Sequence, residues 1–191
     1  LVLNDGWGIS IGNANGLEVS DKIISNSIGN TESSNNPVSY ADGIYVNEAA
    51  VSNSIIQRNT VHSCRFIGIL IDMKYPSVNN SITNNLVYNN FAEQIRFSDW
   101  SSSVFTPVFN TIVKGNTFYS LQSTQVCMKH IMFRSPQFSD YGDFDSNYYC
   151  NPYSEYTIRR TKSNNPWSDL VLSLEIWQNV SGEDPGSKSS V

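Results

Sequence analysis

The sequence predicts an all-β protein built as a solenoid, in which short parallel strands stack from one repeat onto the next. Three observations predict this fold. An Asn-centred pattern occurs five times, a strand-like pattern keeps step with it, and the apolar segments are short, β-branched and separated by Asn, Ser and Gly. A solenoid of α-helices would need long segments with a period of 3.6 residues, rich in Ala, Leu and Glu, and the sequence has none. It is therefore excluded.

The first pattern is an apolar residue, two further residues, an Asn, one residue and a second apolar residue. Its five copies are centred on Asn26, Asn59, Asn85, Asn116 and Asn147, at intervals of 33, 26, 31 and 31 residues. A buried Asn is costly unless its amide is hydrogen-bonded. We therefore expect these side chains to stack along the solenoid axis and to hydrogen-bond from repeat to repeat. Asn also tolerates the left-handed backbone that a tight corner needs.

The second pattern lies upstream of each Asn and consists of an Ile, any residue and another apolar residue. It occurs at residues 9–11, 44–46, 69–71, 95–97 and 131–133. This alternation is typical of a short strand with two side chains facing inward and one outward. Units of this size cannot close a core alone, so successive units bury their inward faces by stacking. The expected outward row is Ser10, Tyr45, Leu70, Arg96 and Met132.

The composition excludes several classes of protein. The 191 residues carry only 15% charged side chains, with a formal net charge of −5, and polarity comes instead from 23 Asn and 29 Ser. Scattered Lys and Arg argue against a nucleic-acid partner, and no apolar run is long enough for a membrane span. The odd number of cysteines without metal-ligand spacing predicts small buried side chains, although one disulfide stays open. His62 and His130 are isolated, and we expect both to be structural or exposed.

The chain divides into repeats at residues 1–150 and a C-terminal cap with a linker-like tail at residues 151–191. Leu172, Leu174 and Trp177 have the spacing of the apolar face of a short helix. Such a cap would protect the last strands from edge pairing. The first residue is Leu1 and the tail is rich in Ser and Gly. We therefore expect a piece of a longer protein, with further domains.

These repeats resemble the right-handed parallel β-helix proteins of the pectin-lyase-like superfamily, in which an Asn ladder lines one corner. The resemblance covers about residues 8–150. The segments 144–152, 173–178 and 182–187 are similar to the ends of secreted bacterial β-helix proteins that are active on carbohydrates. The resemblance implies a right-handed parallel β-helix of about five rungs with a short helical cap, a secreted or cell-surface location, and a polysaccharide partner.

The candidate catalytic and substrate-binding residues lie in or just beyond the strands of three neighbouring rungs. The expected catalytic residues are Lys74, Arg96, Asp72 and Asp99, and the expected substrate-binding residues are Tyr45, Glu48 and Trp100. In a lyase of uronic-acid polymers, Lys74 would abstract the C5 proton, Arg96 would stabilise charge, and the acids would hold Ca²⁺ or the substrate carboxylate. In a glycoside hydrolase, two of the carboxylates would act as acid and as base or nucleophile. The aromatic rings would stack on a sugar in either case.

Two other interpretations stay open. The charged residues would also suit an ordinary solvated surface, and each acid taken singly fits that description better. The outward Leu70 and Met132 would favour packing against another chain, as in a non-catalytic adhesin, a stalk or a carbohydrate-binding module. An active site in rungs before residue 1 would leave this part of the protein without catalytic residues.

Overall fold

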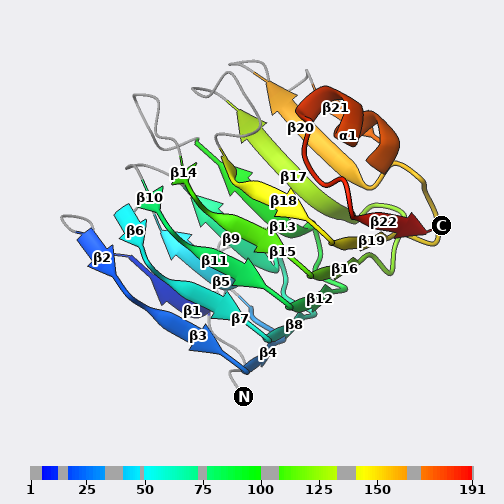
Figure 1. Ribbon diagram of the computed structural model, residues 1–191. Helices are drawn as coiled ribbons and strands as arrows, with labels where there is room; N and C mark the ends of the chain where they lie inside the picture. Colours follow the sequence, from blue (N-terminus) through cyan, green and yellow to red (C-terminus); the bar gives the residue numbers. More distant parts are fainter. Residues whose placement is uncertain are drawn as a thin grey trace.

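The computed structural model describes residues 6–12, 17–32, 41–47, 50–72, 77–99, 108–132, 141–162 and 169–190. The chain winds through five stacked coils, and each strand lies beside the equivalent strand of the next coil (Figure 1). The strands therefore form long parallel sheets that run along the axis. The described pairings are parallel, except that the last two strands of the seven-stranded sheet pair antiparallel. The predicted all-β solenoid with a short C-terminal helix is confirmed.

Four sheets make up the walls of the solenoid. The seven-stranded sheet contains, in spatial order, β1 (Trp7–Ile11), β5 (Asp42–Asn47), β9 (Ile69–Asp72), β13 (Glu93–Ser98), β17 (Val126–Met132), β20 (Ile158–Lys162) and β21 (Asp169–Leu172). The four-stranded sheet contains β14 (Val108–Phe109), β10 (Ser77–Val78), β6 (Ala50–Ser52) and β2 (Leu17–Val19). The five-stranded sheet contains β18 (Asp143–Asp145), β15 (Ile112–Lys114), β11 (Ser81–Thr83), β7 (Ile55–Gln57) and β3 (Lys22–Ile24). The six-stranded sheet contains β22 (Lys188–Ser190), β19 (Tyr148–Cys150), β16 (Thr117–Tyr119), β12 (Leu86–Tyr88), β8 (Thr60–His62) and β4 (Ser27–Gly29).

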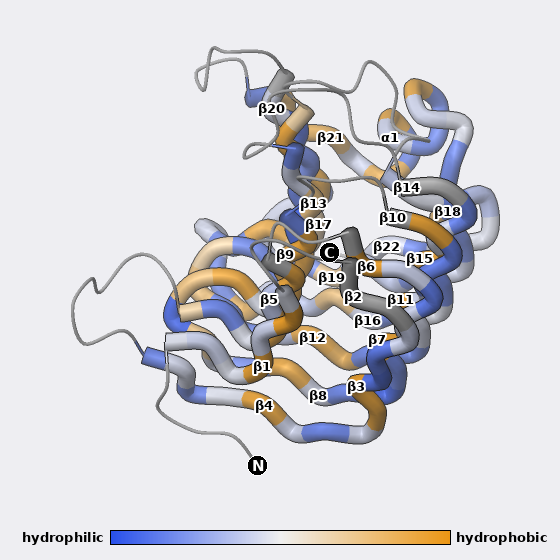
Figure 2. Tube along the Cα trace, turned by 90° about the vertical axis from the view of Figure 1, so that its left-hand side faces the viewer, coloured by the Kyte–Doolittle hydropathy of each residue, from blue (hydrophilic) through white to orange (hydrophobic). Residues whose placement is uncertain are grey.

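The core consists of columns of apolar side chains, one from each coil. In the six-stranded sheet the central residue of five successive strands is completely buried: Ile28, Val61, Val87, Phe118 and Tyr149. Figure 2 shows the same column as orange segments at the centres of β4, β8 and β12. Complete burial of one such side chain stabilises the fold by roughly 1.5–3 kcal/mol. Stacking the repeats is thus what stabilises each of them.

The Asn ladder predicted from the repeat is confirmed. The side-chain Oδ1 of Asn85 accepts from both the backbone N and the Nδ2 of Asn59 at 3.0 Å, and the same double contact recurs along the ladder. The left-handed backbone, however, belongs to the residue before each ladder Asn. These residues are Ser25, Arg58, Asn84, Gly115 and Ser146, with φ between 55° and 66°. The ladder Asn is therefore selected by its hydrogen bonds, not by its backbone.

The fifth coil differs from the predicted register. The strand expected at 131–133 aligns three residues earlier, because Ile95 pairs with Met128, Arg96 with Lys129 and Phe97 with His130. Lys129 therefore occupies the place in the outward row that the sequence pattern gave to Met132, which is instead buried in the core.

The C-terminal part closes the solenoid with helix α1 (Leu174–Ser181) and β22. Ser173 caps the helix by accepting from the backbone N of Ile176, and Leu174 and Trp177 are buried as expected. Leu172 lies in β21 rather than in the helix. The linker-like composition of the tail was misleading, because Lys188–Ser190 adds a parallel strand beside β19. None of the described residues forms a helix long and apolar enough to span a membrane.

The histidines and cysteines are structural. His130 is fully buried between the rings of Phe97 and Trp177, and its burial lowers its pKa to about 3. His62 stacks on Tyr88 with ring centroids 5.1 Å apart. All three cysteines are free thiols, and burial raises the pKa of the two most buried, to about 11 for Cys64 and about 12 for Cys127.

Candidate functional site

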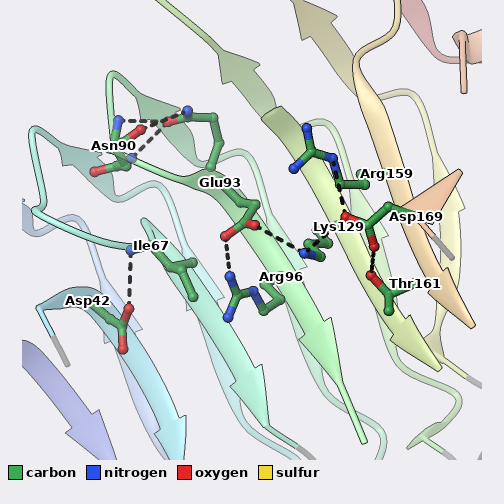
Figure 3. Close-up of polar contacts among 10 residues, drawn as sticks. Asp42, Ile67, Asn90, Glu93, Arg96, Lys129, Arg159, Thr161 and Asp169 are labelled. Atoms are coloured by element: carbon green, nitrogen blue, oxygen red, sulfur yellow. Dashed lines mark hydrogen bonds and ion pairs between the residues drawn. The ribbon is translucent and has the colours of Figure 1, made fainter. Parts of the chain in front are cut away.

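The candidate site lies on the outer face of the seven-stranded sheet, where two rows of side chains cross neighbouring strands. Figure 3 draws the polar contacts of the charged members of these rows. The first row contains Trp7, Asp42, Ile67, Glu93 and Val126. The second row contains Ser10, Tyr45, Leu70, Arg96, Lys129 and Arg159. Parallel neighbours are about 4.8 Å apart, so each row brings chemically different groups into contact.

A backbone feature explains why the two rows share one face although they are three residues apart. Gly43 and Ile44 both face the core, and a Cβ on Gly43 would meet Val61 Cγ1 at 2.3 Å. Only Gly fits at this close approach. The extra inward residue returns Asp42 to the outer side, beside Tyr45.

Glu93 is the centre of an ion-pair network. Its Oε2 accepts from Arg96 Nη2 at 2.6 Å, and its Oε1 lies 3.8 Å from Lys129 Nζ. The Glu93 side chain is 5% exposed and both cations are 15% exposed, so water screens these contacts weakly. Arg96 also lies 4.9 Å above the ring of Phe66. Its Nε is buried and donates to no group within the described ranges.

The network continues to the last strands of the sheet. Asp169 Oδ2 lies 3.8 Å from both Lys129 Nζ and Arg159 Nε, and its Oδ1 accepts from the hydroxyl of Thr161. Burial lowers the pKa of Lys129 below its ordinary value, and Glu93 opposes that shift. Three adjacent strands thus each place a cation on the outer face, with a carboxylate on either side of Lys129.

Asp42 is the group with the most altered acidity on this face. It is 1% exposed, and burial raises the pKa of its carboxyl group from 3.8 to about 7. The backbone N of Ile67 donates to its Oδ1 at 3.1 Å, which stabilises the ionised form and limits the rise. Asp42 therefore exchanges a proton near neutral pH, as a general acid or base must.

Apolar and aromatic side chains border these charges. Tyr45, Ile67 and Leu70 form a small cluster outside the solenoid core, and Phe66 packs against it. The rings of Trp7 and Tyr45 are 5.4 Å apart. The face therefore combines aromatic groups, cations and carboxylates.

The structure brings some of the predicted site residues together and separates others. Arg96 and Tyr45 lie on the outer face as expected. Asp72 pairs with Ser98, so Asp99 lies one residue beyond the position opposite Asp72, and its side chain is 1% exposed. Glu48, Lys74 and Trp100 lie outside the described residues.

The structure does not test the calcium expectation, because Glu48, one of its three acids, lies outside the described residues. Among the described residues, no group of three or more His, Cys, Asp or Glu could hold a metal ion. Calcium needs several oxygen ligands at once. We therefore assign it no step.

Sequence reasoning missed three charged groups of this face, namely Asp42, Glu93 and Lys129. Asp42 and Glu93 each stand two residues before the strand-like triplet, at equivalent places in two coils. Comparing that position across the repeats would have revealed both acids. Lys129 was missed because the fifth triplet was assigned three residues too late.

The comparisons with known proteins agree with this architecture. Residues 3–135 match the family model described as "Right handed beta helix region". The match covers more than half of the chain, so the protein belongs to the right-handed β-helix family. No curated protein and no solved structure matches the chain in the two other comparisons.

Proposed function

We propose that this protein binds an extracellular, uronate-containing polysaccharide across the outer face of the seven-stranded sheet and cleaves it by β-elimination. The observation that carries the proposal is the row of Arg96, Lys129 and Arg159 on three adjacent strands. Cations at strand spacing match the repeated carboxylates of an acidic polymer. The partly desolvated Lys129 has the lowered pKa that an amine base requires.

The chemistry assigns one role to each of two neighbouring side chains. Arg96 faces the carboxylate of a uronate unit, and its guanidinium neutralises the charge that builds up when C5 loses its proton. The neutral amine of Lys129 accepts that proton, the C4–O bond breaks, and the departing oxygen takes a proton from solvent. Because the base must be deprotonated, activity rises with pH, with a midpoint below the ordinary lysine value of 10.5.

A glycoside hydrolase is the second candidate, and the raised pKa of Asp42 favours it. Asp42 and Glu93 are separated by two strand steps, about 9.6 Å between their backbones. That separation is closer to the about 6.5–9.5 Å of inverting enzymes than to the about 5–5.5 Å of retaining ones. Asp42 would protonate the leaving group and Glu93 would activate water.

The test is to incubate the full chain with polygalacturonate, alginate and neutral glucans, measuring both unsaturated uronate by ultraviolet absorbance and reducing ends. We expect Lys129→Ala to lower unsaturated product at least about 100-fold, while Lys188→Ala, an exposed cation on β22, changes nothing. Reducing ends without unsaturation, lost in Asp42→Asn, would replace the lyase with the hydrolase. Binding without any product would favour a non-catalytic adhesin, stalk or carbohydrate-binding module.

A further inference from the structure

A concave surface lies at the corner where the chain leaves the six-stranded sheet and enters the seven-stranded sheet. It is a groove of about 260 Å³, and four successive coils contribute to its walls. Its lining includes Asn30, Glu32, Arg65, Asn89, Phe91 and Gln122. None of these residues belongs to the two rows of the candidate site described above.

Hydrogen bonds fix the polar wall of this groove. Asn89 Nδ2 donates to Ser63 Oγ at 3.4 Å, and Gln125 Nε2 donates to Asn89 Oδ1 at 3.2 Å. Gln125 Oε1 in turn accepts from the backbone N of Leu121 at 2.7 Å. This wall is therefore held in place before any ligand arrives, which lowers the entropic cost of binding.

Two further amides stand at the rim with their hydrogen-bonding groups available. Asn30 and Gln122 are exposed, and neither side chain hydrogen-bonds to another residue of the described ranges. Each amide offers two donors and one acceptor oxygen. A sugar hydroxyl both donates and accepts, so it can satisfy either end of such an amide.

Charge and aromatic character narrow the class of ligand. The two charged side chains in the lining, Glu32 and Arg65, lie 4.0 Å apart as an exposed pair, so the groove carries no net charge. An anionic ligand would need an excess of cations in the lining. Phe91, 59% exposed, offers an apolar ring beside the amides. A flat apolar face with a polar periphery is the shape of a pyranose ring.

We propose that this corner groove binds a neutral sugar unit of a glycan, with Phe91 against the sugar ring and the side chains of Gln122 and Asn30 on its hydroxyls. The groove is a separate binding site and does not depend on the proposed cleavage of an acidic polymer. A protein with both sites would hold a neutral glycan at one corner and an acidic chain on the neighbouring face.

The experiment is isothermal titration calorimetry of the full chain with neutral gluco-, xylo-, manno- and galacto-oligosaccharides. We expect at least one of them to bind, and Phe91→Ala and Gln122→Ala each to weaken that binding about tenfold. Ile176→Ala, which removes another exposed apolar side chain, on α1, is the control and leaves affinity unchanged. Lys129→Ala also leaves it unchanged, which separates this site from the proposed lyase site.

Either of two results would overturn the proposal. One is that no neutral oligosaccharide binds the full chain. The other is that binding persists at full strength in both Phe91→Ala and Gln122→Ala. Because both side chains are exposed, the variants should fold, and circular dichroism with thermal unfolding verifies this before titration.

Discussion

Two buried titratable side chains, Asp42 and His130, influence the stability of this protein in opposite directions. The folded pKa of Asp42 is raised from 3.8 to about 7, so the folded state holds a proton that the unfolded state has lost, and stability falls as pH rises between these values. The folded pKa of His130 is lowered from 6.5 to about 3, so stability rises with pH between about 3 and 6.5. The two effects largely cancel between about pH 4 and 6.5.

Asp42→Asn should reveal the contribution of His130. Because the variant has no carboxyl group at position 42, its free energy of unfolding should increase steeply with pH as His130 titrates, by up to about 1.4 kcal/mol per pH unit. The free-energy gain of the variant over the wild type should grow by a few kcal/mol, on the order of 4 at most, between pH 4 and 8. Urea unfolding at several pH values measures this. Parallel stability curves for the two proteins would show that Asp42 ionises normally in the fold.

Asn85 tests the ladder at the level of one side chain. Its amide accepts from Asn59 and donates to the backbone O of Ile56 and to Asn116, all in the interior. Asn85→Ala leaves several buried groups unpaired and should destabilise the protein by at least about 3 kcal/mol. The control is Asn84→Gly, at an exposed left-handed residue that Gly also accommodates, which should change stability by less than about 1 kcal/mol. Equal losses in urea unfolding would contradict the ladder's importance.

The predictability of the site also differs residue by residue. Arg96 and Tyr45 were predicted because they lie within strands whose alternation fixes which way a side chain faces. Asp42 and Glu93 were missed because an extra inward residue, such as Gly43, breaks that alternation next to them. A period-two pattern cannot reveal such an irregularity, because the extra inward residue reverses the face on which every residue beyond it lies.

Among the elements, the C-terminal cap shows how composition can mislead. The tail reads as a linker because it is rich in Ser, Gly and charge, yet Asp184 within it is completely buried. Its carboxylate accepts from Asn147 Nδ2 at 3.0 Å, Tyr149 Oη at 2.8 Å and Trp177 Nε1 at 2.7 Å. One acid therefore ends the Asn ladder and fastens α1 to the last coil. Only the spatial meeting of distant segments gives this residue its role, so no local pattern predicts it.

Removing that carboxylate should loosen the cap. Asp184→Ala removes the acceptor of four buried donors, the fourth being the Ser187 hydroxyl, and should cost at least about 3 kcal/mol, with hydrogen exchange accelerated first in α1 and β22. The matched control is Asp143→Ala, whose carboxylate makes an exposed ion pair with Lys114 and should contribute less than about 1 kcal/mol. If both variants unfold at the same urea concentration, Asp184 does not hold the cap.

At the scale of the whole molecule, the fold was predictable because every coil repeats the same physical problem. Each must bury a column of apolar side chains and satisfy one Asn, so the signal adds up over five copies. The outer face carries no such constraint, since each coil can place a different side chain there. An outward row that reads Tyr45, Leu70, Arg96 and Lys129 in successive coils has no period to detect. The residues that decide function on a solenoid are therefore those that differ between repeats.

The distribution of charge over the whole molecule leads to a last prediction. The chain has a net charge of −5, yet its outer face presents cations on three adjacent strands, whereas the corner groove is neutral. An acidic polymer is therefore attracted locally against an unfavourable overall field, and that attraction is screened when salt shortens the Debye length from about 30 Å at 0.01 M to about 3 Å at 1 M. Binding of polygalacturonate should weaken at least tenfold over this range, while binding of a neutral oligosaccharide stays constant. Affinity measurements with both ligands across the salt series test whether they bind at different surfaces. The same salt response for both ligands would mean that one surface binds both.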